Sequence, residues 1–193
     1  MNYLIIASHP YNGSFNAGIA KNAEEILKQK GHSVESINLV ADGFDPVMHS
    51  EDLRLWGKGQ FTEPNIPKYM KAIEKADVLI FPIPSWWGTM PAILKGFCDK
   101  VLLPGWAYTV GENGSLIGQL TGKKAIVVST MQTPEAYYTG YFKCPIDGAF
   151  IKDTLFTCGI ETTKHFIFDN MSAGGRQHAE EKMKEVVDFL NQQ

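Results

Sequence analysis

The sequence predicts an α/β fold, a three-layer sandwich whose five-stranded parallel sheet has the strand order 2-1-3-4-5 and carries helices on both faces. Three observations predict it. Short continuous apolar runs recur along the chain, as in strands that are buried on both faces. Segments with apolar residues at helical spacing alternate with these runs. The 193 residues fit one domain, which we expect to span 1–193.

The first half begins with the apolar run Tyr3–Ala7, which we expect to form a buried strand. Apolar residues at helical spacing follow, and Gly31 is placed to end that helix. The segment Val34–Leu39 predicts a second strand. Residues 40–66 are rich in glycine and proline and are expected to be irregular. Connections of this length are uncommon in compact domains and are often functional.

The second half continues the alternation of helices and strands. Pro91 stands at the first turn of a predicted helix, the part of a helix that tolerates proline best. A glycine-rich connection covers residues 104–122, and a long loop covers Ser129–Pro145. The predicted elements, in order, are a helix over Ile66–Lys75, a strand over Val78–Phe81, a helix after Pro91, a strand over Ala125–Val128, a helix near 146–157, a strand near 160–168 and a closing helix that contains Met183 and Leu190.

Composition excludes several classes of protein. The net charge is −3, from 18 basic and 21 acidic residues without a dense basic patch, so we expect no nucleic-acid partner. The three cysteines, Cys98, Cys144 and Cys158, form no C-x-x-C pair, and the histidines show no metal-ligand spacing. We therefore expect no metal site and no disulfide framework. Free thiols and the lack of a long apolar stretch predict a cytoplasmic protein without membrane insertion.

The first candidate binding loop, Ser8–Asn16, leaves the first strand and opens the first helix. Free backbone N–H groups and the helix dipole favour an anion there, and His9, Ser14 and Asn16 would add donors. The loop therefore indicates a phosphate or pyrophosphate site. The alternative is that Ser14 or Asn16 only caps the helix. The loop contains neither the glycine pattern of a nicotinamide Rossmann site nor a P-loop.

The second candidate loop, Pro82–Pro91, follows the third strand and contains the adjacent tryptophans Trp86 and Trp87. Large exposed apolar side chains are unfavourable unless something covers them, and a planar ring is a suitable cover. Backbone amides of the same loop could hydrogen-bond the polar edge of a flavin. The alternative is that the tryptophans fill the core or a dimer interface, where Trp is enriched.

A third region combines Trp106-Ala107-Tyr108 with the loop Thr130–Pro134 and the tyrosines Tyr137, Tyr138 and Tyr141. Aromatic rings and hydroxyl groups around a flat ligand could form an acceptor pocket. The alternative is that these side chains serve packing alone. Five bulky apolar residues lie in connections and favour a homodimer, because a monomer would leave them uncovered; they are Trp56, Phe61, Trp106, Tyr138 and Phe142.

Four motifs occur in the same order as in one known family: His9-x4-Ser14-Phe15-Asn16, Phe44-Asp45-Pro46, Trp87-x3-Pro91 continuing to Gly96, and Ala107-Tyr108. On these motifs the sequence resembles the NAD(P)H:quinone oxidoreductase family, the DT-diaphorase-like branch of the flavodoxin-like fold. The resemblance runs from residue 3 to about residue 130 and continues more loosely to the end.

This resemblance implies a flavin, FAD or FMN, and NAD(P)H as co-substrate. Reduced nicotinamide would deliver hydride to the flavin, and a quinone or similar small acceptor would then take its place in the same pocket. The implied roles are, for cofactor binding, His9, Ser14, Phe15, Asn16, Pro84, Ser85, Trp86, Trp87, Gly88, Ser129, Thr130, Met131 and Gln132; for substrate binding, Trp106, Ala107 and Tyr108; and for catalysis, Tyr108 and Tyr137.

The family usually works as a dimer, and FAD is favoured over FMN because residues 41–64 correspond to a segment near the adenosine in FAD-binding relatives. The chain departs from the pattern at Thr130-Met131-Gln132, where the family has Thr-Gly-Gly. Three alternatives remain open: a one-electron flavodoxin carrier, a flavin-binding regulatory subunit of a membrane transporter, and an azo- or nitroreductase.

Overall fold

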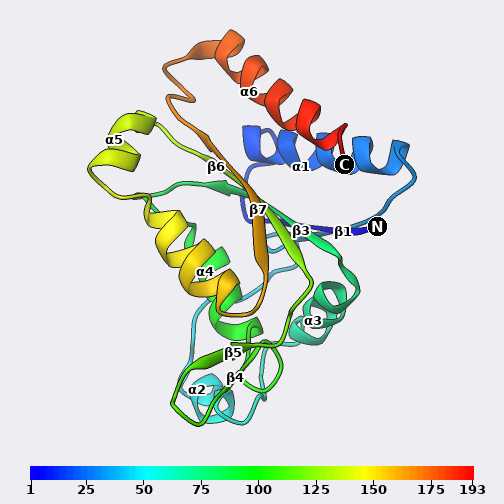
Figure 1. Ribbon diagram of the computed structural model, residues 1–193, viewed down its shortest axis with the longest axis vertical. Coiled ribbons are helices and arrows are strands. Elements are labelled where there is room, and N and C mark those ends of the chain that lie inside the picture. The colour runs from blue at the N-terminus through cyan, green and yellow to red at the C-terminus, as the bar shows by residue number, and fades with distance from the viewer.

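A computed structural model describes residues 1–193 and has a central sheet of five strands (Figure 1). The order of the strands is β2-β1-β3-β6-β7, and every neighbouring pair is parallel. Counted along the chain without a separate hairpin, this is the predicted order 2-1-3-4-5. The strands are β1 (Asn2–Ala7), β2 (Ser33–Asn38), β3 (Val78–Pro84), β6 (Lys124–Thr130) and β7 (Glu161–Phe168).

Helices cover both faces of this sheet (Figure 1). α1 (Phe15–Gln29) and α6 (Gly175–Leu190) pack together on one face. The other face carries α3 (Ile66–Lys75), α4 (Ala92–Val101) and η1 (Asp147–Phe156). Alternate residues of β1 serve the two layers, since Tyr3 packs in the α1–α6 core and Leu4 in the other. The apolar runs are therefore strands buried on both faces, as predicted.

Four short elements lie in segments that we expected to be irregular. They are α2 (Ser50–Trp56), the antiparallel hairpin of β4 (Tyr108–Val110) and β5 (Leu116–Gly118), and α5 (Glu135–Gly140). None is longer than seven residues. Segments this short contain too few residues for a periodic pattern to emerge, and tertiary contacts rather than intrinsic propensity stabilise them. None of the helices has the length and hydropathy that a bilayer-spanning segment needs.

The helix expected near residues 146–157 is present, but it is wound as a π-helix over Asp147–Phe156. One side-chain contact follows the same wider spacing, because the hydroxyl of Thr154 donates to the carbonyl oxygen of Ala149, five residues earlier, at 2.8 Å. π-Helical segments are rare and are frequent at functional sites. Hydrophobic periodicity does not distinguish this winding from an α-helix over so few turns.

The motif Phe44-Asp45-Pro46 packs directly against α4. A Cβ atom at Gly96 would overlap the carbonyl oxygen and the ring of Pro46, so only glycine permits this close approach. On the same helix, Phe97 contacts the ring of Phe44, with centroids 6.3 Å apart. The excursion over residues 40–66 is therefore a packed part of the fold, and the two motifs that contain Pro46 and Gly96 are one structural unit.

A buried ion pair holds the same excursion in place. The Nζ atom of Lys100 lies 3.2 Å from Oδ2 of Asp52 and donates to the carbonyl oxygen of Val47 at 3.0 Å. Burial acts to raise the pKa of Asp52, but hydrogen bonds from Thr62, the His49 backbone and Lys100 together lower it below its ordinary value. Because both charges are almost completely buried, loss of either partner would leave an uncompensated charge.

We expect Gly96→Ala to lower the free energy of unfolding by about 1–3 kcal/mol, because the added methyl group overpacks the contact with Pro46. Gly148→Ala in η1 is the matched control, since a Cβ atom there meets nothing within 4 Å. Urea unfolding of the two variants measures the difference. Equal midpoints for the two variants would contradict the packing argument.

Candidate active site

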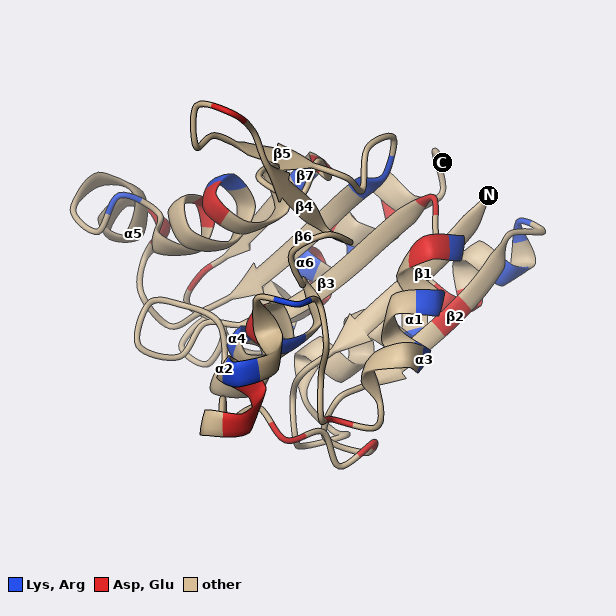
Figure 2. Cartoon of the chain, turned by 90° about the horizontal axis from the view of Figure 1, so that it is seen from below, with Lys and Arg blue, Asp and Glu red and all other residues tan.

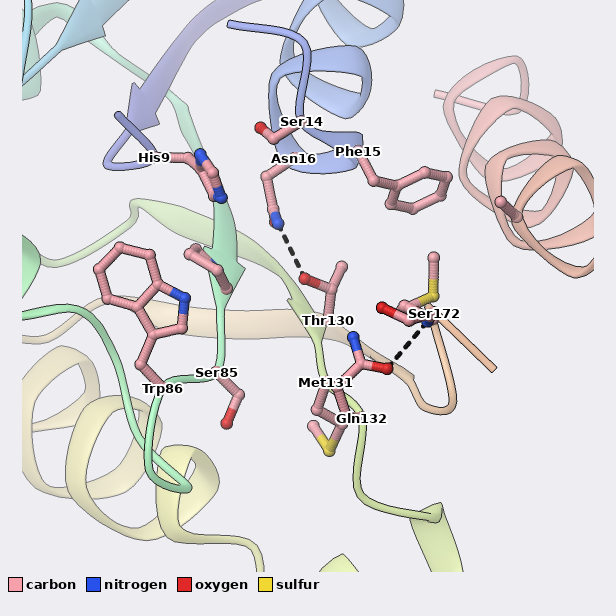
Figure 3. A pocket seen from close by; sticks show the side chains of 13 residues that line it. His9, Ser14, Phe15, Asn16, Ser85, Trp86, Thr130, Met131, Gln132 and Ser172 are labelled. Atoms are coloured by element: carbon pink, nitrogen blue, oxygen red, sulfur yellow. Dashed lines mark hydrogen bonds between the residues drawn. The ribbon is translucent and has the colours of Figure 1, made fainter. Parts of the chain in front are cut away.

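A cavity of about 430 Å³ opens at the carboxyl ends of β1, β3, β6 and β7 (Figure 3). Ligands of doubly wound folds bind at this edge of the sheet, where loops leave neighbouring strands. Four loops and the first turns of α1 and α6 line the cavity. The lining residues are His9, Ser14, Phe15, Asn16, Pro84, Ser85, Trp86, Thr130, Met131, Gln132, Met171, Ser172 and Ala179.

The amino end of α1 presents free backbone donors to this cavity. Ser14 is the N-cap, and its Oγ accepts from the backbone N–H of Ala17 at 3.1 Å. The backbone N–H of Gly18 donates to the carbonyl oxygen of Ser14. The N–H groups of Phe15 and Asn16, in the first turn, have no intrahelical acceptor. Together with the helix dipole they form a site suited to an anion.

Asn16 connects this helix to the end of β6. Its Nδ2 atom donates to Oγ1 of Thr130 at 2.8 Å, as Figure 3 shows, although the two residues are 114 positions apart. Both residues are largely buried. The other amide atom of Asn16, Oδ1, is buried and has no hydrogen-bonding partner within the protein. Buried polar atoms are rarely left unpaired, so this atom indicates a ligand or ordered solvent at the site.

His9 and Trp86 form another part of the wall. Nδ1 of His9 accepts from the backbone N–H of Tyr11 at 3.0 Å, so in the neutral ring Nε2 carries the proton and is the donor. The ring of His9 meets Trp86 edge-on, with centroids 5.8 Å apart. The contact combines a polar donor with an aromatic surface, which is suited to a ligand that has both a flat ring and polar atoms.

The loops after β6 and β7 are joined across the cavity. Oε1 of Gln132 accepts from the backbone N–H of Ser172 at 2.8 Å (Figure 3). The backbone N–H of Met171 donates to the carbonyl oxygen of Met131 at 3.1 Å. Where the resembling family has two glycines, this chain therefore has a backbone hydrogen bond at Met131 and a side-chain hydrogen bond at Gln132 that join the two loops. The Nε2 donor of Gln132 remains available beside the cavity.

None of the thirteen lining residues is an Asp, Glu, Lys or Arg. Charged residues lie on the helices and outer connections, and the central strands β1, β3 and β6 carry almost none (Figure 2). Nor does any group of three or more His, Cys, Asp or Glu side chains lie together as metal ligands would. The cavity is therefore a neutral site. Its polar groups are backbone N–H groups, side-chain hydroxyl groups, the side-chain amides of Asn16 and Gln132, and the imidazole of His9.

Three of the predicted cofactor-binding residues lie beside the cavity without lining it. Trp87 is fully exposed at the tip of its loop, with φ at +52°, and Gly88 follows with φ at +82°. Ser129 is completely buried beneath the cavity, where its Oγ lies 2.8 Å from Nε2 of His165. Burial lowers the pKa of His165, while the nearby carboxylate of Asp147 acts in the opposite direction.

The predicted substrate and catalytic residues lie elsewhere. Tyr108 lines a separate hollow of about 580 Å³ between α2, α4, the hairpin and η1, and Ala107 is buried next to it. Trp106 donates its indole N–H to Glu74 at 2.8 Å. Tyr137 is half exposed on α5, stacked on Tyr141 with centroids 5.1 Å apart. None of these side chains lines the 430 Å³ cavity.

Sequence reasoning missed three lining residues, Met171, Ser172 and Ala179. They come from the loop between β7 and α6 and from the first turns of α6. A signal for them was present, because the fifth parallel strand ends at the same edge as the others and its loop must also meet the site. The loops that follow β1, β3 and β6 carry the predicted residues, and the loop that follows β7 carries these three.

Comparison with known proteins agrees with this architecture. The sequence family described as having a flavodoxin-like fold matches residues 1–192. The chain belongs to this flavodoxin-like family. An uncharacterized NAD(P)H oxidoreductase of Haemophilus influenzae is 33% identical to it over 178 residues, which are 89% of this chain and 85% of that protein.

Two further relatives of this flavodoxin-like chain cover most of its length. The ribosyldihydronicotinamide dehydrogenase [quinone] of Homo sapiens is 30% identical over 187 residues, which are 82% of this chain and 77% of that protein. The crystal structure of Smu.1420 from Streptococcus mutans is 30% identical, has a TM-score of 0.86 and covers 100% of both chains. The resemblance inferred from the sequence motifs is thereby confirmed at the level of the family.

The hydrogen bond between the buried Ser129 and the partly buried His165 predicts acid sensitivity. Because burial lowers the pKa of His165 in the folded chain, the unfolded chain binds its proton more readily below about pH 6.5. We therefore expect the free energy of unfolding to fall as the pH falls from 7 to 5, by at most about 1.4 kcal/mol per pH unit for this one group. Urea unfolding of the wild type and of His165→Gln tests this, and the same pH dependence in both would refute it.

Proposed function

We propose that this chain is a flavin-dependent NAD(P)H oxidoreductase that passes two electrons to a quinone or similar small acceptor. The observation that carries the proposal is the neutral cavity at the amino end of α1, which combines free backbone donors with the exposed Trp86 in its wall and the exposed Trp87 beside it. The names of the Haemophilus and human relatives support it, because they describe NAD(P)H oxidation and quinone reduction.

The residues of the cavity fit a flavin. The first turn of α1 would hold its phosphate with the N–H groups of Phe15 and Asn16. The hydroxyl group of Thr130 accepts from Asn16, so its own proton would donate to an acceptor atom of the flavin. Thr130 and Gln132 would meet the polar edge of the ring system, and Trp86 would flank its plane. When bound, the flavin supplies the hydride chemistry, and the protein orients it and controls access of water.

The alternative functions differ in whether a second substrate binds and in whether the protein turns over. A one-electron carrier needs no second substrate, whereas the exposed Trp87 next to the cavity is suited to a flat organic acceptor. An azo- or nitroreductase would use the same cavity with a different acceptor. The regulatory subunit of a membrane transporter would bind flavin without turnover.

We infer FAD rather than FMN. The excursion over residues 41–64, which the sequence analysis assigned to the adenosine, contributes no residue to the cavity. The support comes instead from Met171, Ser172 and Ala179, which add a wall to the cavity from the loop after β7 and from α6. The adenosine of FAD would lie against this wall, between the amino ends of α1 and α6.

We also propose a homodimer. Leu116 lines the 580 Å³ hollow that Tyr108 lines, and Ile117 and Phe156 are the chain neighbours of lining residues; all three are at least half exposed. Exposed apolar surface beside a hollow is typical of interfaces. Tyr138, which the sequence analysis counted among the residues in need of cover, is already buried within one subunit. A catalytic role for Tyr108 would require a second copy whose cavity faces this hollow, and light scattering at twice 21.5 kDa would support the dimer.

The decisive experiment combines an absorption spectrum with steady-state turnover. Protein reconstituted with FAD or FMN is expected to show flavin bands at about 370 and 450 nm and to oxidise NADH or NADPH with a quinone. Flavin binding without turnover would favour the carrier or the regulatory subunit. Failure to bind either flavin at micromolar concentration would refute the proposal.

Ser14→Ala and Asn16→Ala separate the cap of α1 from the cofactor site. Loss of the cap in Ser14→Ala should lower the free energy of unfolding by about 1 kcal/mol. Asn16→Ala should instead weaken flavin binding about tenfold or more, because it removes the hydrogen bond that holds Thr130 beside the ligand. Thermal melting and flavin titration of both variants test this contrast, and a normal flavin affinity for Asn16→Ala would overturn it.

Ala179→Phe tests the place of the adenosine. The larger side chain would fill the cavity next to α6, so we expect weaker binding of FAD and unchanged binding of FMN. Mass spectrometry of the flavin retained by the purified wild type gives the natural cofactor. Equal weakening of both flavins would place the adenosine elsewhere.

A further inference from the structure

A second, much smaller cavity lies behind the first. Its volume is about 20 Å³, and it shares His9 and Asn16 with the 430 Å³ cavity. A single water molecule needs about 10–15 Å³ of such space and two to four polar partners. The small cavity is therefore large enough for one water molecule and too small for an organic ligand.

Two of the residues that line this small cavity carry unpaired polar atoms. Oγ of Ser8 and Oδ1 of Asn16 are both buried without a hydrogen-bonding partner in the protein, and the two residues are 1% and 5% exposed. Asn38 also lines the cavity. Its Oδ1 accepts from the backbone N–H groups of Val40 and Ala41, so its amide donors remain available. A water molecule here would have a hydroxyl group, a carbonyl-type acceptor and an amide donor as partners.

The orientation of the Asn16 amide determines whether Thr130 can donate a hydrogen bond into the large cavity. Because its Nδ2 donates to Oγ1 of Thr130 at 2.8 Å, the acceptor atom Oδ1 faces away from Thr130. Oγ1 of Thr130 already accepts this bond, so its own proton is free to donate. Thr130 lines the large cavity, where the proton can reach a ligand acceptor.

We propose that Ser8 and Asn16 hold one buried water molecule and that Ser8 thereby acts as a positioning residue for Thr130. The water fixes the Asn16 amide with Nδ2 toward β6, and this orientation leaves the Thr130 hydroxyl as a donor to the ligand. Without the water partner, the Asn16 amide can flip and present Oδ1 to Thr130. The Thr130 hydroxyl would then donate its proton to Asn16 instead of to the ligand. The effect on the ligand rests on the proposed flavin site, whereas the water site does not.

The chain offers matched variants for a test. Ser8→Ala removes the hydroxyl group, and Ser8→Thr retains it at the same position. Thr162→Val is the control, because Oγ1 of Thr162 is likewise buried and unpaired but lies at the start of β7, the opposite end of the sheet from the cavity.

The first measurement is a high-resolution crystal structure of the wild type without flavin. We expect an ordered water molecule within hydrogen-bonding distance of Ser8 Oγ and Asn16 Oδ1. A well-ordered site without water, or an Asn16 amide with Oδ1 toward Thr130, overturns the proposal whether or not the protein binds flavin.

The second measurement is titration with FAD, and with FMN in parallel, together with circular dichroism of the bound flavin. Ser8→Ala should weaken binding about five- to tenfold, the equivalent of one hydrogen bond of about 1–1.4 kcal/mol, and should change the flavin dichroism. Ser8→Thr should restore both, and Thr162→Val should change neither. Wild-type affinity and dichroism in Ser8→Ala overturn the role of Ser8. A wild type that binds no flavin refutes the proposed function instead, and the crystal structure still decides the water site.

Discussion

The hydrogen bond from Asn16 to Thr130 joins the two halves of the site. It links the first turn of α1 to the last residue of β6. The bond therefore spans the switch point between β1 and β3, where the order of the strands in the sheet reverses. On one side of this bond lie free backbone donors, and on the other lies the loop that continues to Gln132. The spacing between the amino end of α1 and the loop after β6 therefore depends on one buried contact between side chains.

A second set of contacts, remote from the cavity, supports the loop that carries Trp86 and Trp87. Lys100 and Asp52 fix the excursion against α4, and Pro46 packs on Gly96 of the same helix. The loop that carries Trp86 and Trp87 leads directly into α4. The packing of α4 thus sets where the tryptophan loop ends, although none of these supporting residues lines the cavity.

The sequence predicted the elements that obey a strong periodic rule. The five strands, their order and the helix Ile66–Lys75 follow from apolar runs and from helical spacing. Elements whose stability comes from tertiary contacts were not predicted. The helix Ser50–Trp56 depends on a buried ion pair with Lys100, a residue 48 positions beyond Asp52 in the chain. No local pattern contains that information.

The site residues also differ in whether a strong local pattern predicts them. The loops after β1, β3 and β6 were found because they follow recognisable strands, and ten of the predicted residues line one cavity. Tyr108 and Tyr137 were grouped with them by aromatic character alone, and the fold places both outside that cavity in the subunit. Aromatic composition does not report direction, whereas position at the end of a parallel strand does.

The absence of charged side chains from the cavity lining has a consequence for how a ligand is captured. Attraction between fixed charges is screened over about 8–10 Å at moderate ionic strength, and electrostatic steering falls steeply as salt is added. Neutral donors at short range are affected far less. A ligand held by the first turn of α1 is therefore retained through changes of ionic strength that would release it from a cluster of lysines, and its arrival is governed by ordinary diffusion and by fit.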